Sequence, residues 1–218
     1  MKNKFKTYIV FLIVCFVNIN TIIFANDFIF DGAEIKITEK GNIIQSSNGN
    51  AKTLDGTIEI IAKNFIYIKD KAILTATGDV FLKDFTNNIT LRSKKIIFDE
   101  SKAIITATGN VFLKDSLNNI TMKSQTIISN RIDRTIQSNT DSVLEDKLSN
   151  SFFTKKFLFT QNDRLIKINN AKLIDSENNT YNILNAFIDL DSNKLIGKDI
   201  SIDFNNLYFE KDNEPRLK

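Results

Sequence analysis

The chain has 218 residues, of which 42% are hydrophobic, and this is enough for one domain of ordinary size with a substantial core, or for two small ones. It contains no histidine and only one cysteine, Cys15, which lies near the N-terminus. Without these residues in the body of the chain, Ser–His and Cys–His nucleophile systems and His or Cys metal sites are excluded. We therefore expect no cofactor and no bound metal.

Residues 1–25 predict a secretory signal peptide. Lys2, Lys4 and Lys6 give a positively charged start, an apolar run follows, and Ala25 supplies a small residue before a cleavage point. The alternative is an N-terminal membrane anchor, but a span needs about 20 unbroken apolar residues, and Asn18 interrupts this run. We expect an exported protein whose folded part is residues 26–218.

Removal of this segment makes the chain neutral. It takes away three of the 29 basic residues and none of the 26 acidic ones, which leaves 26 of each. Nucleic-acid binding depends on an excess of Lys and Arg on one face, so we expect no nucleic acid as a partner. The exported part also has no cysteine and must be stable without disulfides.

A strand–turn–strand unit first appears at residues 48–70 and is clearest in two later copies. KAILTATGDVFLKDFTNNIT starts at Lys71, and KAIITATGNVFLKDSLNNIT starts 31 residues later at Lys102; the two differ at four of twenty positions. Weaker copies follow at residues 150–159 and 168–175, and residues 200–210 add one more expected strand. Self-similarity of this period indicates stacked units that bury a face only together.

Each unit has the alternation of a strand with one buried face. In the first clear copy the even-numbered residues from Leu74 to Leu82 are apolar and narrow to Ala76 and Gly78 in the middle, while the odd-numbered ones are mostly polar. DFTNN provides a turn, and in the return strand the apolar positions slip by one residue at Lys94–Lys95, which predicts a bulge. The whole mature chain therefore predicts an all-β fold of repeated antiparallel strands.

The apolar positions of all copies define one predicted inner face. Its members are Ile60, Phe65, Tyr67, Leu74, Ala76, Gly78, Val80, Leu82, Ile89, Leu91, Ile96, Phe98, Ile105, Ala107, Gly109, Val111, Leu113, Ile120, Met122, Ile127, Phe157 and Phe159. Two interpretations are open at this point. The small residues leave room for a lipid chain in a slot, or they permit sharp curvature around a closed core.

Carboxylate pairs are the remaining source of catalysis, as in glycoside hydrolysis. Asp84 and Asp115 recur at matching positions, but both stand where a turn begins, and the other acids are scattered through turns. We interpret them as turn residues and expect no enzyme. A carbohydrate-active β-solenoid and a structural β-repeat protein are the weaker alternatives, because the former shows shorter coils and the latter lacks a one-sided apolar face.

The repeated motif resembles the OstA-like domain. The resemblance rests on Gly-Asp/Asn-Val-x-Leu followed by Ile-x-Leu/Met-x-Ser, and it covers about Asp27 to Lys218. That domain is the periplasmic module of the lipopolysaccharide transport system, found in LptA and in the N-terminal part of LptD. The opening segment FDGAEIKITEKG and the closing NEPRLK are more similar to LptD than to LptA.

The resemblance implies a fold, a cargo and partners. It implies an open V-shaped β-jellyroll whose apolar slot holds the acyl chains of lipopolysaccharide. It also implies that such modules join by edge-strand pairing in the periplasm and that the protein is associated with the outer membrane. It also implies an outer-membrane β-barrel that follows or accompanies Lys218, although the sequence has no such segment and no cysteine in its mature part. Part of an LptD-type protein and a free-standing LptA-type protein therefore both remain open.

Overall fold

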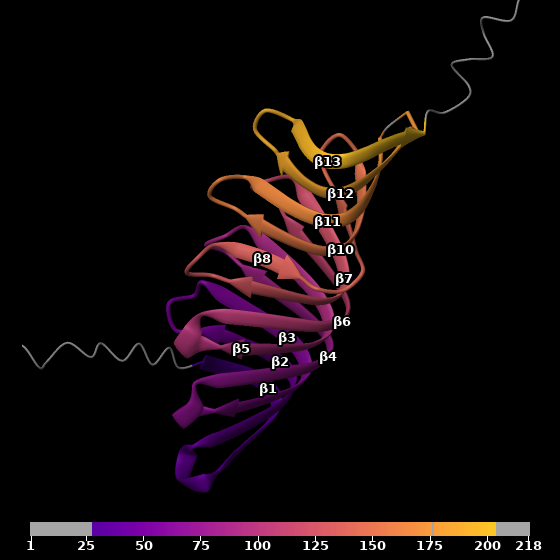
Figure 1. Cartoon of the computed structure of the whole chain (residues 1–218). Coiled ribbons are helices and arrows are strands. Elements are labelled where there is room, and N and C mark those ends of the chain that lie inside the picture. The colour runs from indigo at the N-terminus through magenta and orange to yellow at the C-terminus, as the bar shows by residue number, and fades with distance from the viewer. Residues whose placement is uncertain (1–27, 176, 204–218) are drawn as a thin grey trace, which may run out of the picture.

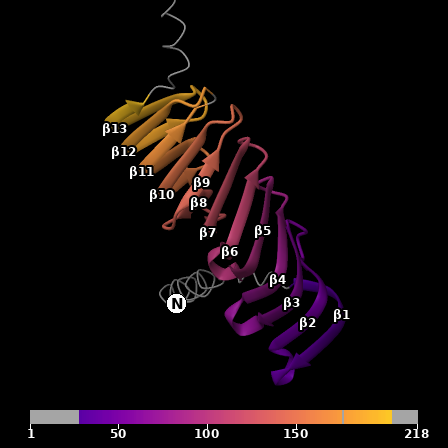
Figure 2. The same ribbon diagram turned by 90° about the vertical axis from the view of Figure 1, so that its right-hand side faces the viewer.

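The computed structural model describes residues 28–175 and 177–203, so the signal-peptide expectation and the closing NEPRLK lie outside the described residues. The described chain is all-β, as predicted, with antiparallel pairing between neighbouring strands in one 13-stranded sheet. Figure 1 shows the strands stacked nearly in chain order from β1 at one end to β13 at the other, and Figure 2 shows the same column from the side. The elements are β1 (Phe28–Thr38), the 3₁₀ turn η1 (Glu39–Gly41), β2 (Ile43–Thr53), β3 (Ile58–Ile68), η2 (Lys69–Lys71), β4 (Ile73–Asp84), β5 (Ile89–Asp99), η3 (Glu100–Lys102), β6 (Ile104–Asp115), β7 (Ile120–Asn130), β8 (Thr135–Ser138), β9 (Ser142–Glu145), β10 (Ser151–Thr160), β11 (Leu165–Ile174), β12 (Thr180–Asp189) and β13 (Lys194–Asp203).

A crease crosses the sheet near the middle of the strands. A bulge is found beside the predicted slip at Lys94–Lys95, but its extra residue lies on the partner strand: Thr77 pairs with Lys95 and Val80 with Ser93, so two residues of β4 oppose one of β5. The same shift recurs between β6 and β7. β8 and β9 are the two halves of one broken strand, since both pair with β7 and with β10.

The crease divides the strands into two arms. We call arm A the strand halves joined by the β2–β3, β4–β5, β6–β7, β9–β10 and β11–β12 turns, and arm B the halves joined by the turns at their opposite ends. The arms fold onto each other, because Phe28 of arm A packs against Tyr67 and Phe98 of arm B at ring-centroid distances of 5.4 and 6.0 Å. The core therefore lies between two layers of the same sheet.

The two arms are displaced along the stack. Asp84, at the arm A end of β4, bonds to Arg131, which follows the arm B end of β7, three strands further on. Phe28, on the arm A half of β1, likewise packs against the arm B halves of β3 and β5 rather than against the arm B half of β1. We call this displacement the skew, and it leaves arm B uncovered at the β1 end and arm A uncovered at the β13 end.

Candidate functional site

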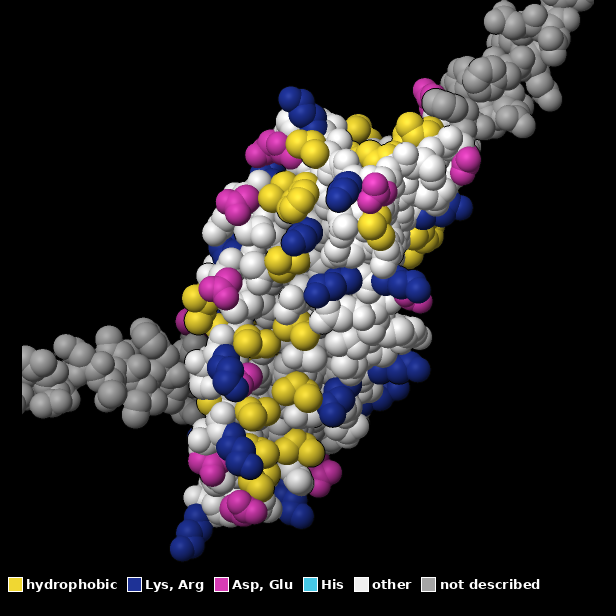
Figure 3. Space-filling model, in the orientation of Figure 1, with side chains coloured by type: hydrophobic (Ala, Val, Ile, Leu, Met, Phe, Trp, Pro, Cys, Tyr) yellow, Lys and Arg dark blue, Asp and Glu magenta, His cyan; other side chains and the backbone are white. Residues whose placement is uncertain are grey.

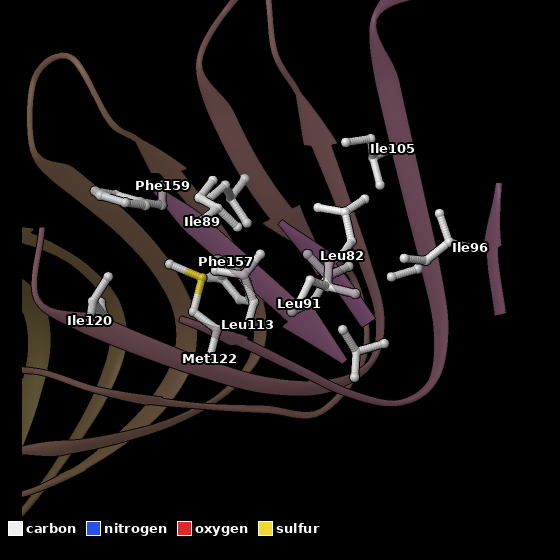
Figure 4. Close-up of a cluster of buried hydrophobic side chains, with 14 of the residues drawn as sticks. Leu82, Ile89, Leu91, Ile96, Ile105, Leu113, Ile120, Met122, Phe157 and Phe159 are labelled. Atoms are coloured by element: carbon white, nitrogen blue, oxygen red, sulfur yellow. The ribbon is translucent and has the colours of Figure 1, made fainter. Parts of the chain in front are cut away.

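The predicted inner face is the buried interior between the arms. All of its predicted members except Gly78 and Gly109 are at most 4% exposed. Figure 4 shows residues of arm A, among them Leu91, Leu113 and Met122, together with Ile96 and Phe157 of arm B. The interior is thus continuous and apolar through the middle of the stack.

Large and small side chains alternate across the arm B strands. Phe65 pairs with Ala76, which pairs with Ile96, which in turn pairs with Ala107, so each alanine lies between bulky neighbours. Both alanines are fully buried. The alternation fills the interior, and the predicted small residues therefore do not form an empty slot in this conformation.

Gly78 and Gly109 differ from the prediction. They lie in the crease with φ of +83°, and a Cβ on either one would point at the side chain of Lys63 or Lys94 rather than into the interior. The reason is the bulge, in which Gly78 and Asp79 both have positive φ and both leave the alternation. These glycines shape the fold of the sheet and are not among the interior side chains.

Small hydroxyl residues line the inside of the crease. Ser93 Oγ donates to the Lys95 carbonyl at 3.1 Å, and Thr154 Oγ1 donates to the Lys156 carbonyl at 2.8 Å. Ser93 and Thr154 are 8% and 5% exposed, so small polar side chains take buried positions at the crease and hydrogen-bond to the backbone there.

Both ends of the interior are open as a result of the skew. At the β1 end, Ile35 and Ile37 are 46% and 61% exposed although they pair with inner-face positions of β2. At the β13 end, Ile200 and Ile202 are 44% and 45% exposed opposite Ile183 and Tyr181. Figure 3 shows hydrophobic side chains at the surface at the β13 end. The apolar interior therefore continues to each terminal strand.

A cavity of about 150 Å³ lies at the β13 end between the arms. Its apolar lining includes Phe152, Leu173 and Tyr181 of arm A and Ile188 and Leu190 of arm B. The rest of the lining is largely polar and includes Asp146, Asn150, Asp175, Asp189, Asn193 and Lys194. The cavity therefore presents apolar and charged side chains together.

Polar side chains join the free edges of the arms in the middle of the stack, and sequence reasoning missed this contact. Arg131 Nε donates to Asp84 Oδ2 at 2.8 Å, and the side chains are 15% and 2% exposed. One repeat further on, Gln161 Nε2 donates to Asp115 Oδ2 at 2.7 Å. Arg164 Nη1 also donates to Asn118 Oδ1 at 2.7 Å. We call these three interactions the clasp.

Asp84 and Asp115 also begin turns, as the sequence predicted. Each accepts the backbone N–H and the side-chain amide of the asparagine three residues later, Asn87 or Asn118, at 2.8 to 3.0 Å. The turn fixes both carboxylates and leaves one oxygen able to accept from arm B as well. The turn motif is thus the arm A half of the clasp, and a matching Asp-x-x-Asn in both copies was the only sequence signal for it.

Other turn carboxylates carry lowered pKa values. Hydrogen bonds from the side chains of Lys102 and Ser101 hold the pKa of Asp99 below its usual value of 3.8. At Asp175, burial acts to raise the pKa, but the side chain and backbone of Asn179 and the Tyr181 hydroxyl donate to it, and the net shift is downward. These groups are turn caps, and in the described residues no group of acidic, His or Cys side chains is arranged to hold a metal ion.

The described residues thus form an all-β protein in which one creased sheet encloses an apolar interior. No protein-family model matches the chain, and no curated protein matches it. Among solved structures it is similar to LptH from Pseudomonas aeruginosa, described as the LptA-homologous periplasmic component of the lipopolysaccharide transport device. The identity is 11% and the TM-score 0.30, over 68% of this chain and 94% of that chain. Among the described residues, no helix has the length and apolarity needed to cross a membrane.

Proposed function

We propose that this protein is a periplasmic module of the OstA-like class that carries the acyl chains of lipopolysaccharide between its arms and passes them to a neighbouring module. The observation that carries the proposal is the apolar interior, which runs through the stack and opens at both terminal strands. A closed structural repeat gives no reason for exposed isoleucines at both terminal strands, which here are Ile35 and Ile37 at one end and Ile200 and Ile202 at the other. The motif resemblance names the lipid class.

We also propose that the protein works outside the cytoplasm, after cleavage of residues 1–25, and in association with the outer membrane. Within the class we favour the N-terminal domain of LptD, on the opening and closing segments, over a free-standing LptA-type bridge. N-terminal sequencing of the exported protein tests the first part and should give Asn26 as the first residue. Membrane-embedded protein that retains Met1 would contradict it.

The terminal strands supply the proposed docking surfaces. Among the described strands, β1 pairs only with β2, and β13 only with β12, so each leaves one row of backbone N–H and C=O groups available for another strand. Pairing of a β13-like edge with β1 would also bring the uncovered interior faces of the two modules together. We therefore expect other OstA-like modules as partners.

A single methionine makes the lipid test direct. The chain has two methionines, Met1 and Met122, and only the second is in the proposed mature protein. A diazirine analogue of methionine, incorporated throughout, therefore places one photoreactive group of nearly native size in the interior, where Met122 is fully buried. Irradiation with lipopolysaccharide should attach the lipid to this residue.

The matched control moves the probe by one residue. In Met122→Leu/Lys123→Met the analogue lies on the outer face, because neighbouring side chains of a strand point to opposite sides. This variant should capture no lipopolysaccharide. Analogues at Leu91 and Val111, against Arg92 and Asn110, extend the comparison. Equal capture by inner and outer positions would mean that the apolar face is only a closed core.

A pair of proline variants tests edge docking. The N–H groups of adjacent strand residues point to opposite sides, so one of Ile35 and Lys36 donates toward β2 and the other toward the open edge. Only the variant at the outward position should weaken binding to a partner module while leaving the melting temperature close to that of the native protein. Undiminished binding by both folded variants would count against docking through β1.

A further inference from the structure

The clasp closes the interior along the side of the stack, away from its two ends. Its partners come from arm A turns that lie opposite arm B turns 46 or 47 residues further along the chain. The interior behind it is filled by side chains such as Leu82, Leu113 and Phe159, which are at most 1% exposed. An acyl chain can lie there only if the arms move apart, and the clasp, together with a hydrogen bond of 3.3 Å from Arg131 Nη2 to Thr57 Oγ1, joins their edges.

The clasp ends where the cavity begins. The turns after β7, β10 and β12 are equivalent, since the first residue of each, Arg131, Gln161 or Leu190, donates its backbone N–H to the preceding arm B turn at about 3.0 Å. The first two of these residues carry the polar side chains of the clasp. The third is Leu190, which lines the cavity of about 150 Å³. At the position equivalent to the polar side chains of the clasp, this repeat thus has an apolar side chain that makes no polar closure and borders a cavity of mixed apolar and charged lining.

The two edges of the clasp have opposite hydrogen-bonding character. Arm A contributes the acceptor oxygens of Asp84, Asp115 and Asn118, while arm B contributes the donors of Arg131, Gln161 and Arg164. When the arms part, buried acceptors and donors lose their partners, and each needs a replacement. Hydroxyl groups can donate to the carboxylates, and phosphate oxygens can accept from the guanidinium groups.

We propose that the clasp is a lateral gate through which an amphiphile reaches the interior, and that its separated edges then bind the headgroup. The acyl chains lie between the arms, and the headgroup lies along the line that the clasp occupies when closed. A headgroup with both hydroxyls and phosphates, such as a phosphorylated sugar, satisfies both edges. This inference rests on the proposed lipid-carrying function and adds the route and the residues that bind the headgroup.

A reversible lock tests the gate. Thr57 of arm A and Arg131 of arm B face each other beside the clasp, with Oγ1 and Nη2 3.3 Å apart. The proposed mature chain has no cysteine of its own, so two introduced cysteines would be the only ones in it. Thr57→Cys/Arg131→Cys, joined by a short cleavable dithiol-reactive linker, holds the arms together, and reduction of the linker releases them. Lipid A is the ligand, and photo-crosslinking at Met122 is the readout. The locked protein should capture lipid at least tenfold more slowly, and cleavage should restore the rate.

The outcomes separate the gate from the function on which it rests. Equal rates in the locked and released protein would overturn the gate and leave the proposed function standing, with the lipid using the open ends. No capture by native, locked or released protein would overturn both. If the double variant fails to fold, Asn118→Cys/Arg164→Cys provides the same lock one repeat further on.

The headgroup is tested with two ligands and with a control substitution of an arginine on the outer face. Native protein should capture phosphorylated lipid A at least tenfold better than its dephosphorylated form, and Arg131→Met/Arg164→Met should lose this preference. Arg92→Met should keep it, because Arg92 lies on the outer face over the Phe81 ring at 4.5 Å. An unchanged preference in the folded double variant would overturn the headgroup assignment.

Discussion

Replacement of Gly109 by alanine should lower the free energy of unfolding, because the crease requires a residue without a side chain at this position. The variant meets two separate penalties. At φ of +83° an L side chain is strained by about 1–2 kcal/mol, and the new Cβ would lie 2.9 Å from Lys94 Cβ and 3.0 Å from its Cδ. Overpacking of this kind usually adds about 1–3 kcal/mol, and the nearest atom is Lys94 Cβ, which the backbone holds in place, so rotation of the Lys94 side chain does not relieve the contact. We expect about 2–5 kcal/mol of lost unfolding free energy.

Gly41→Ala is the matched control for this variant. Gly41 has φ of +96°, but a Cβ added there would meet no other atom within 4 Å, so its replacement carries the strain alone. Urea unfolding followed by the far-ultraviolet circular dichroism of the β structure gives both values. The steric share is the difference, about 1–3 kcal/mol. A loss at Gly109 no larger than that at Gly41, or a loss below about 0.5 kcal/mol, would refute this account of the crease.

Three further predictions concern the clasp, the interior and the turns. Arg131→Met leaves the carboxylate of Asp84 with only its turn partners, and we expect a loss of about 2 kcal/mol in urea unfolding, below the about 3–5 kcal/mol typical of fully buried pairs because Arg131 is partly exposed. Lys63→Gln, which removes an exposed ion pair, should leave the urea midpoint unchanged. Met122→Ala should destabilise the protein by about 2–5 kcal/mol, and a smaller loss would indicate a loosely filled interior. Stability should be flat between about pH 5 and 8, because the chain has no histidine, and should fall as the pH drops below about 4. The turn carboxylates Asp99 and Asp175 have folded pKa values below their unfolded values. Their contribution to the unfolding free energy is therefore present above the unfolded pKa and is lost as the pH falls through the folded pKa. A series of melting temperatures over pH 2–8 that changed steeply near pH 6 would contradict this.

Local patterns in the sequence predicted most of the fold. The alternation around Leu74 and Leu82, the DFTNN turn and the slip at Lys94–Lys95 each depend on neighbours in the chain or on the adjacent strand, and all are found in the structure. The placement of Gly78 on the inner face was wrong, because a bulge that takes up two residues keeps the even-numbered pattern while it turns those two residues outward. A Gly-Asp or Gly-Asn pair, both prone to positive φ, was the available signal.

The skew and the clasp were beyond local reasoning. They join residues 46 or 47 positions apart, and the pairing depends on how far one arm slides along the other when the sheet folds. Sequence periodicity fixes the faces of the strands but carries no information on this displacement. Arg131 and Gln161 occupy equivalent positions, yet they share no residue type, so the repeat itself gave no reason to connect them with Asp84 and Asp115.

The repeat of 31 residues determines how the length of the protein can change. One unit supplies two strands, so its duplication returns the chain to the same direction and the same face, and every later strand keeps its pairing. Each added unit lengthens the column by about 10 Å, since neighbouring strands lie about 4.8 Å apart. A single added strand would instead reverse the chain and exchange its turns between the arms. The near-identity of the copies at Lys71 and Lys102 fits extension by whole units, so the reach of the protein grows in steps of a fixed size.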